Sequence, residues 1–318
     1  MCEKIPSLPK EKSKMTKNKS KLAILAAIGV YTLWGFTFMA AKVAQGYVTP
    51  FILLAYRFDI AALLLSIPVI TGKQKIKLKG KNIKPLLLLG LMEPCIYFIG
   101  EQYGLRYTNA AFSGVMIAVI PIVTLVFTAV FLKEKPTRAQ WLFCILSISG
   151  VIAITLSENS GGDIRLIGLL CLIVAVFTGS AYSIISRSIS DDFSVFERTF
   201  VMMLMAAVFY TALALAENAN DLGALTAPLH HGDFILAVLY LAVGASVLGY
   251  TMFNFAVSNA PMPKVIIFCN LVTVFSVLSG VFLLKEHFSA VSAVAMVAVL
   301  IGIWGVQKFD NENKKSSS

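Results

Sequence analysis

The chain has 318 residues, of which 58% are hydrophobic and 14% are charged, and its mean hydropathy is +0.80. Ordinary soluble domains are about 45 to 50% apolar, so this composition excludes a soluble domain and indicates an integral membrane protein. The net charge of +10 would suggest nucleic acid in a soluble chain, but its distribution here favours a membrane topology signal, and we expect no nucleic-acid partner.

Apolar stretches separated by charges, Gly/Pro clusters and polar runs recur along the sequence. A spanning helix needs about 20 largely apolar residues, and continuous apolar runs favour helices over the alternating strands of a membrane barrel. We predict an all-α membrane protein with ten transmembrane helices. The predicted spans are 22–44, 50–70, 84–104, 109–132, 138–156, 164–186, 193–216, 234–256, 261–284 and 289–307.

Lysines concentrate in the N-terminal segment 1–21 and in the second predicted loop, 71–83. With the N-terminus inside, 21 of the 27 Lys and Arg residues fall on the cytoplasmic side and three on the outer side. This asymmetry predicts a multi-pass protein of the cytoplasmic membrane with both termini cytoplasmic. We expect residues 1–21 to form a disordered basic tail attracted to anionic membrane lipids, and residues 308–318 to form a second cytoplasmic tail.

The two halves of the sequence resemble each other. FLKEKPTRAQWLFCILSISGVIAI (131–154) matches LLKEHFSAVSAVAMVAVLIGIWGV (283–306), which aligns Lys133-Glu134 with Lys285-Glu286 and Gly150 with Gly302. We therefore predict one repeat over 22–158 and another over 159–307. Each repeat has five spans, an odd number, so the second repeat is expected to be inverted in the membrane, as in alternating-access transporters.

The third predicted span contains LLLLGLMEPCIYFIGEQYGL (86–105), which carries two carboxylates. A charge at the bilayer centre costs about 3 kcal/mol, so such residues generally face a wet cavity or a partner. On a helix Glu93, Tyr97 and Glu101 share one face, and Pro94 removes a backbone hydrogen bond beside Glu93. We expect Glu93 to be a protonatable residue of a central pathway; the alternative is a protonated carboxyl that bonds a neighbouring helix.

Arg57 lies in the second span at a depth similar to that of Glu101. We expect Glu101 to be an outer-vestibule charge held by an ion pair with Arg57. Two alternatives stay open for Arg57: a side chain that extends to the lipid headgroups, or contact with an anionic group of a solute. Other pathway candidates are aromatic or uncharged polar residues, for which packing or interhelical hydrogen bonding is the alternative. They are Trp34, Tyr182, Tyr250, Asn254 and Asn270.

No motif in the sequence points to a metal, a cofactor or a catalytic centre. The five cysteines show no CxxC spacing, and the adjacent His230 and His231 point apart, so no metal site is predicted. The sequence has no HExxH, GxSxG or Gly-rich phosphate loop, and we expect neither an enzyme nor an ATP-driven pump. Gly100 and Gly104 form a GxxxG that suits close helix contact within the bundle, and a homodimer stays open.

The ordered set of features resembles the EamA-type ten-helix carriers of the drug/metabolite transporter superfamily. It comprises two five-helix repeats, WGFTFMAAK in the first span, Arg57 in the second, twelve residues between Pro121 and Glu134, and the LKEK and LKEH turns. The resemblance covers residues 22–307. It implies a central pathway lined mainly by the first four helices of each repeat, peripheral fifth and tenth helices, and small organic solutes that are commonly exported. The chain departs from relatives at Asn270-Leu271, where they often carry Glu-Pro.

We expect a secondary transporter that exports a small organic metabolite, such as an amino acid or a related solute, by alternating access with proton coupling. A multidrug exporter of the same fold is the alternative. A channel-like facilitator is a third candidate, but channels need rings of charges or carbonyls around a pore, and the intramembrane charges fall almost entirely in the first repeat.

Overall fold

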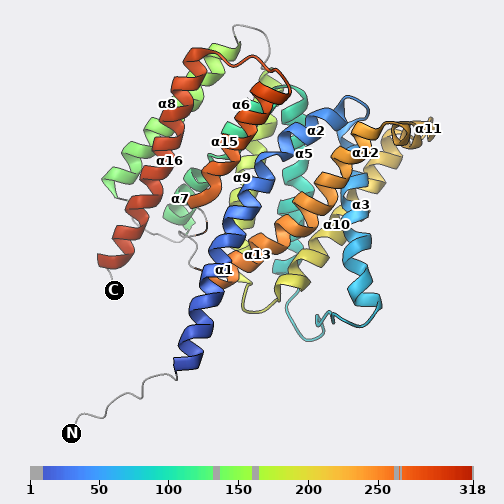
Figure 1. Cartoon of the computed structure of the whole chain (residues 1–318), viewed down its shortest axis with the longest axis horizontal. Helices are drawn as coiled ribbons and strands as arrows, with labels where there is room; N and C mark the ends of the chain where they lie inside the picture. The colour runs from blue at the N-terminus through green and yellow to red at the C-terminus, as the bar shows by residue number, and fades with distance from the viewer. Residues whose placement is uncertain (1–9, 132–136, 160–164, 261–264, 266, 317–318) are drawn as a thin grey trace.

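The structure is a computed structural model that describes residues 10–131, 137–159, 165–260, 265 and 267–316. The described residues form helices joined by short connections and contain no strand (Figure 1). Lys133 and Glu134, which the repeat and family patterns include, lie outside the described residues.

The helices follow each other in two sets that correspond to the two sequence halves. The first set is α1 (Lys10–Gly35), α2 (Thr37–Gln45), α3 (Pro50–Ile70), α4 (Lys84–Gly90), η1 (Leu91–Ile96), α5 (Tyr97–Arg106), α6 (Ala110–Ile117), α7 (Ile120–Phe131) and α8 (Arg138–Asn159). The second set is α9 (Leu166–Ser188), α10 (Val195–Glu217), α11 (Gly223–Thr226), η2 (Ala227–His230), α12 (Gly232–Leu239), η3 (Tyr240–Leu248), α13 (Gly249–Asn259), η4 (Ile267–Cys269), α15 (Asn270–Leu278), η5 (Ser279–Leu283) and α16 (Ala290–Ser316).

Six helical segments among the described residues are long and apolar enough to cross a membrane, by length and composition. They are Lys19–Gln45, Pro50–Ile70, Ala110–Phe127, Leu166–Ser188, Val195–Glu217 and Gly232–Asn259, and they coincide with six of the ten predicted spans. Three shorter apolar helices lie at the fifth, ninth and tenth predicted spans. The third predicted span is helical but is interrupted near Glu93.

The expectation of a disordered N-terminal tail differs from the structure over residues 10–21, because α1 begins at Lys10 and runs without a break into the first apolar span. Residues 1–9 lie outside the described residues. Starting a helix is costly, whereas extending an existing one is cheap. Lys, which supplies six of the twelve residues from 10 to 21, is a good helix former. The span therefore provides the nucleus from which the helix extends back into the basic segment. At the other end of the chain, α16 continues through Ser316.

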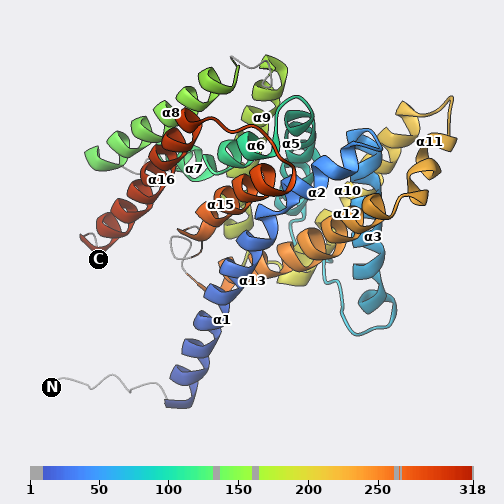
Figure 2. The ribbon, with the colours of Figure 1, turned by 45° about the horizontal axis from the view of Figure 1, so that its top comes forward.

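Helices of the first half pack on helices of the second half in a reciprocal pattern. α3 contacts α10, α6 contacts α15, and α8 contacts α16, so these three contacts each join helices at equivalent places in the two halves. α1 contacts α13 and α5 contacts α9. These two contacts are equivalent, because α1 of the first half corresponds to α9 of the second and α5 corresponds to α13. Both views show α8 and α16 side by side at one edge of the bundle, away from α3 and α12 (Figures 1 and 2).

Two pairs of equivalent helices, α3 with α10 and α8 with α16, run antiparallel to each other. Thr49, just before α3, donates a 2.5 Å hydrogen bond to Glu217 at the end of α10. Ser157, near the end of α8, lies 2.7 Å from the hydroxyl of Ser289, just before α16. Helices that are equivalent in sequence but opposite in direction are what two inverted repeats require.

Glycines allow the closest of these helix contacts. A Cβ at Gly150 of α8 would lie 2.8 Å from the carbonyl oxygen of Ala295, and one at Gly302 of α16 would lie 2.7 Å from the carbonyl oxygen of Phe143. The aligned glycines thus make equivalent contacts: Gly150 of α8 packs against α16, and Gly302 of α16 packs against α8. The Gly100 and Gly104 pair likewise faces α9, where a Cβ at Gly100 would lie 2.5 Å from a backbone carbonyl oxygen, so this GxxxG serves contact within the chain.

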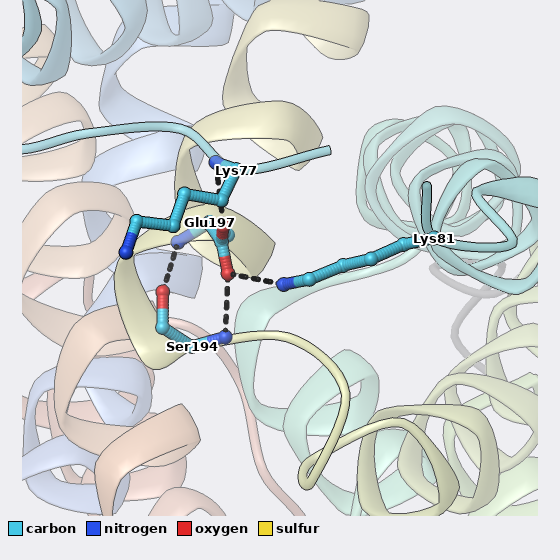
Figure 3. Close-up of polar contacts among 4 residues, drawn as sticks. All are labelled: Lys77, Lys81, Ser194 and Glu197. Atoms are coloured by element: carbon cyan, nitrogen blue, oxygen red, sulfur yellow. Dashed lines mark hydrogen bonds and ion pairs between the residues drawn. The ribbon is translucent and has the colours of Figure 1, made fainter. Parts of the chain in front are cut away.

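The lysine-rich loop between α3 and α4 is bonded to the start of α10 (Figure 3). The Glu197 carboxylate accepts hydrogen bonds from the backbone N–H groups of Lys77 and Ser194, both at 2.8 Å, and from Lys81 Nζ at 3.3 Å. The Ser194 hydroxyl in turn accepts from the Glu197 backbone N–H, which completes a capping box. One carboxylate therefore joins the two halves at the end of the bundle predicted to be cytoplasmic.

Candidate functional site

A cavity of about 90 Å³ lies between the two halves of the bundle. Its walls come from α1, α2, α3, η1, α5, α6 and α7 of the first half and from α9, α13, η4 and α15 of the second. Among the described residues, α8 and α16 contribute none to the lining. A buried water needs about 10 to 15 Å³ of such space, so the cavity has room for several waters or for the compact part of a small solute.

Seven of the nine residues predicted from the sequence line this cavity. They are Trp34, Arg57, Glu93, Tyr97, Glu101, Tyr182 and Tyr250. Asn254 and Asn270 are not among the lining residues, and Asn270 is half-buried with the Cys269 thiol 3.7 Å from its side-chain oxygen.

The third span is interrupted at Glu93, whose backbone angles of φ −145° and ψ 121° are those of an extended chain. The proline that follows cannot donate a backbone hydrogen bond, which leaves carbonyl groups of this segment without their helical partners. Tyr210 of α10 compensates, because its hydroxyl lies 3.0 Å from the carbonyl oxygen of Pro94 and 2.5 Å from that of Cys95. The interruption is thus held open by a helix of the other half.

Glu93 is buried at this interruption and bonds across the cavity. The Tyr250 hydroxyl of α13 donates a hydrogen bond to Glu93 Oε1. Both side chains are nearly inaccessible, with 7% and 1% of their surface exposed. A carboxyl of the first half and a hydroxyl of the second are therefore directly linked inside the bundle.

Glu101 is not where the sequence analysis placed it. Its carboxylate accepts hydrogen bonds from the Tyr97 hydroxyl at 2.7 Å and from Gln102 Nε2 at 2.9 Å. It forms no ion pair within 4.0 Å with Arg57, so the expected Arg57–Glu101 pair is wrong as a contact. Glu101 is only 5% exposed and lines the same cavity as Glu93, which also corrects the outer-vestibule location. Glu101 bonds Tyr97 and not Arg57, because Tyr97 lies one helical turn before Glu101 on the same face.

Arg57 is a buried cation that lines the cavity, with 1% of its surface exposed. Its Nε donates a 2.8 Å hydrogen bond to Ser246 Oγ of η3, and its guanidinium carbon lies 4.3 Å from the centre of the Phe98 ring. Among the described residues, Nη1 has no hydrogen-bond acceptor. A buried donor without a partner costs about 1 to 3 kcal/mol, and more when it is charged, so this one calls for a ligand or for water.

Aromatic rings form much of the remaining wall. Trp34 packs against Tyr250 and Phe253 with ring centres 5.4 Å apart in each case, and its Nε1 donates to the carbonyl oxygen of Ala245 at 3.1 Å. The Trp34 N–H is therefore satisfied by the protein, while its ring faces the cavity. The Tyr182 hydroxyl is buried and has no hydrogen-bond partner among the described residues.

Asn254 belongs to a separate polar cluster that the sequence analysis missed. Arg198 of α10 is fully buried, and its guanidinium donates to the Ser186 carbonyl at 2.8 Å and to Ser258 Oγ at 2.6 Å. Asn254 accepts from the Ser186 hydroxyl at 3.1 Å and donates to Thr199 at 3.0 Å. These bonds join α9, α10 and α13, so Asn254 here makes the interhelical contacts that the sequence analysis gave as the alternative.

Other contacts around the cavity could not have been found from spacing. Lys42, at the end of α2, donates to the carbonyl oxygens of Leu105 at 3.0 Å and Thr108 at 2.8 Å, where it satisfies the end of α5. Ser246 and Phe98 contact Arg57, and Tyr210 contacts Pro94, although the partners are distant in the sequence. Within the part of the chain that the structure describes, no group of three or more His, Cys, Asp and Glu side chains is arranged to hold a metal ion.

The described residues combine apolar helices of membrane-crossing length, reciprocal packing of two halves and a cavity between them that holds buried charged side chains. These are the features of a multi-pass membrane transporter. The chain belongs to the EamA-like transporter family, whose pattern matches residues 21–156 and again 166–307. It is therefore a member of the drug/metabolite transporter superfamily, with one EamA unit in each half, and its family is one of transporters and not of enzymes.

Relatives of similar length carry the same description. The uncharacterized transporter YcxC of Bacillus subtilis is 30% identical over 296 residues, which cover 92% of this chain and 94% of that protein. An uncharacterized transporter of Archaeoglobus fulgidus is 24% identical and covers 86% of this chain and 94% of its own length. A crystal structure with 18% identity superposes with a TM-score of 0.61 over 90% of this chain and 98% of that one, which shows a shared fold.

Proposed function

We propose that the protein is a secondary transporter that carries a small organic metabolite through the cavity by alternating access, with Glu93 as the proton-coupling residue. The observation that carries the proposal is the hydrogen bond from Tyr250 to Glu93, which joins the two halves inside the cavity. The proposal includes ten spans, an inverted second repeat and cytoplasmic termini, and the antiparallel α3–α10 and α8–α16 contacts support it.

The proton state of Glu93 changes the strength of this link between the halves. A hydrogen bond to an ionised carboxylate contributes about 1.5 to 3 kcal/mol, against about 0.5 to 1.5 kcal/mol for a neutral pair. Taking up a proton at Glu93 would therefore weaken the attachment of α13 to the third span and favour rearrangement of the halves. In this way the movement of a proton is coupled to the movement of the solute.

The solute is proposed to be an amino acid or a related metabolite, and the direction to be export. The aromatic wall around Trp34 suits the apolar part of such a solute, while Arg57, Glu93 and Glu101 suit its polar part. A comparison of metabolites in cells and medium, with and without the protein, identifies the solute. A change restricted to unrelated lipophilic cations would favour a multidrug exporter instead.

The coupling test uses Glu93→Gln, which keeps the shape of the side chain and removes its titration. Flux into proteoliposomes is measured with and without a pH gradient, using the solute found in the metabolite comparison. Wild-type flux should depend on the gradient, saturate with solute and show counterflow, whereas Glu93→Gln should lose the pH dependence or stop transport.

Asp59→Asn is the matched control, because Asp59 is a carboxylate of α3 that bonds Thr211 at 2.8 and 2.9 Å and does not line the cavity. This variant should keep the wild-type pH profile. An unchanged pH profile in folded Glu93→Gln protein would leave Glu93 only a structural role. Flux without saturation or counterflow would instead point to a channel-like facilitator.

A further inference from the structure

We propose that Arg57 is the anion subsite of the cavity and binds a carboxylate group of the transported solute through the free edge of its guanidinium. This inference rests on the proposed function, since it takes the cavity as the place where the solute binds. It adds the chemical class of one solute group and the residue that recognises it.

The guanidinium is held in place on two sides. Ser246 accepts the hydrogen bond from Nε, and the Phe98 ring lies below the guanidinium carbon at 4.3 Å. Phe58 adds a second ring with its centre at 5.3 Å. Arginine recognises carboxylates through parallel N–H groups in a fixed plane. Because Nε and the face of the group are already occupied, the Nη edge is the part that remains for a ligand.

The carboxylates nearest in the cavity do not occupy that edge. Glu101 has both oxygens bonded to neutral donors, Tyr97 and Gln102. Glu93 bonds Tyr250, and neither acid lies within 4.0 Å of a guanidinium nitrogen. An arginine with a purely structural role would be expected to take one of these carboxylates. Instead Nη1 stays buried without an acceptor among the described residues.

The surrounding charges favour a carboxylate over a phosphate. Glu93 and Glu101 line the same small cavity, and each contributes a negative charge when ionised. A phosphate monoester carries a charge close to −2 near neutral pH and would be repelled more strongly than a singly charged carboxylate.

The test measures binding and not transport, so its failure is distinct from failure of the proton-coupling proposal. The purified full-length protein is heated in detergent with matched probes that differ in charge, namely formate, acetate and benzoate against formamide, acetamide and benzamide, at constant ionic strength. A ligand that binds only the folded state raises the unfolding temperature. The carboxylates should stabilise the wild type more than their amides do.

Arg57→Gln should weaken the apparent affinity for the carboxylates about tenfold or more, as expected for loss of charge-assisted hydrogen bonds. Arg57→Lys keeps the charge but not the planar pair of donors, so an intermediate loss is expected. Arg106→Gln removes an exposed arginine at the end of α5 and should bind as the wild type does.

Equal stabilisation by carboxylates and amides in the wild type would overturn the proposal, and this comparison needs no variant to fold. A carboxylate effect that survives Arg57→Gln would also overturn it. Stronger stabilisation by inorganic phosphate than by any carboxylate would overturn the assignment to carboxylates.

Discussion

Glu286 joins the two halves at the end of the bundle predicted to be external. Its carboxylate accepts hydrogen bonds from the backbone N–H groups of Ala110 at 2.9 Å and Ala111 at 3.1 Å, at the start of α6. The Asn109 side chain already accepts from Phe112, so three donors of this helix start are satisfied. If the halves separate here to open the cavity, the Glu286 contact must break. Weakening it should therefore favour the state that is open on this side.

The size of the effect follows from the two bonds. A hydrogen bond to a charged group contributes about 1.5 to 3 kcal/mol, but Glu286 is partly exposed, and solvent reduces such terms strongly. We take about 2 kcal/mol for the whole contact, including the favourable charge at a helix N-terminus. Glu286→Ala removes all of it, which shifts the two-state equilibrium about 30-fold. Glu286→Gln keeps a neutral acceptor and should shift it about fivefold.

The assay follows access to the cavity. Ser183→Cys places a thiol on the cavity lining in a background without the five native cysteines, and a membrane-impermeant thiol reagent is added to one side at a time. Labelling from the Glu286 side should increase in the order wild type, Glu286→Gln, Glu286→Ala, by the factors above. Glu197→Gln weakens the contact at the opposite end and should increase labelling from that side. Unchanged labelling together with a lower unfolding temperature would refute the reasoning, because the contact would then be present in both states.

Two further predictions concern packing and topology. Gly302→Ala places a Cβ 2.7 Å from the Phe143 carbonyl oxygen and should lower the free energy of unfolding in detergent by about 1 to 3 kcal/mol. The control Gly232→Ala, whose Cβ would have no atom within 4 Å, should leave it unchanged. Equal unfolding midpoints for the two variants would contradict the close α8–α16 contact. The labels Thr137→Cys and Ser289→Cys should react from opposite sides of the membrane, since five spans separate these equivalent positions, and labelling of both from one side would rule out the inverted repeat.

Local spacing predicted the parts of the site that depend on one helix. Glu101 and Tyr97 are four residues apart, and they meet within α5. Pro94 predicted an interruption beside Glu93, and the backbone there leaves the helical conformation. The family resemblance depended on patterns spread over both halves, and the family match confirms it.

Contacts between distant helices could not be predicted in the same way. Arg57 was expected to bond Glu101 because the two share a depth, but depth does not say which way a side chain turns around its helix. Its neighbour Ser246 lies in the π-helical segment η3, whose altered winding shifts every later side chain relative to a regular helix. Asn254 was assigned to the pathway by polarity alone, and its actual partners come from α9 and α10.

Three interruptions in the helices of the first half lie at the cavity. α1 ends at Gly35 and α2 begins at Thr37, the third span leaves the helix at Glu93, and a gap separates α6 from α7 at Ala118. Thr37, Glu93 and Ala118 all line the cavity. Within a membrane, irregular backbone is tolerated where it is buried in protein or faces a polar cavity, because its freed groups then find partners. α8 and α16, in contrast, are each one continuous helix and pack on each other. Weakening that pair at Gly302 should therefore change stability alone, whereas changes at Glu93 or Arg57 should alter transport through the proposed solute pathway.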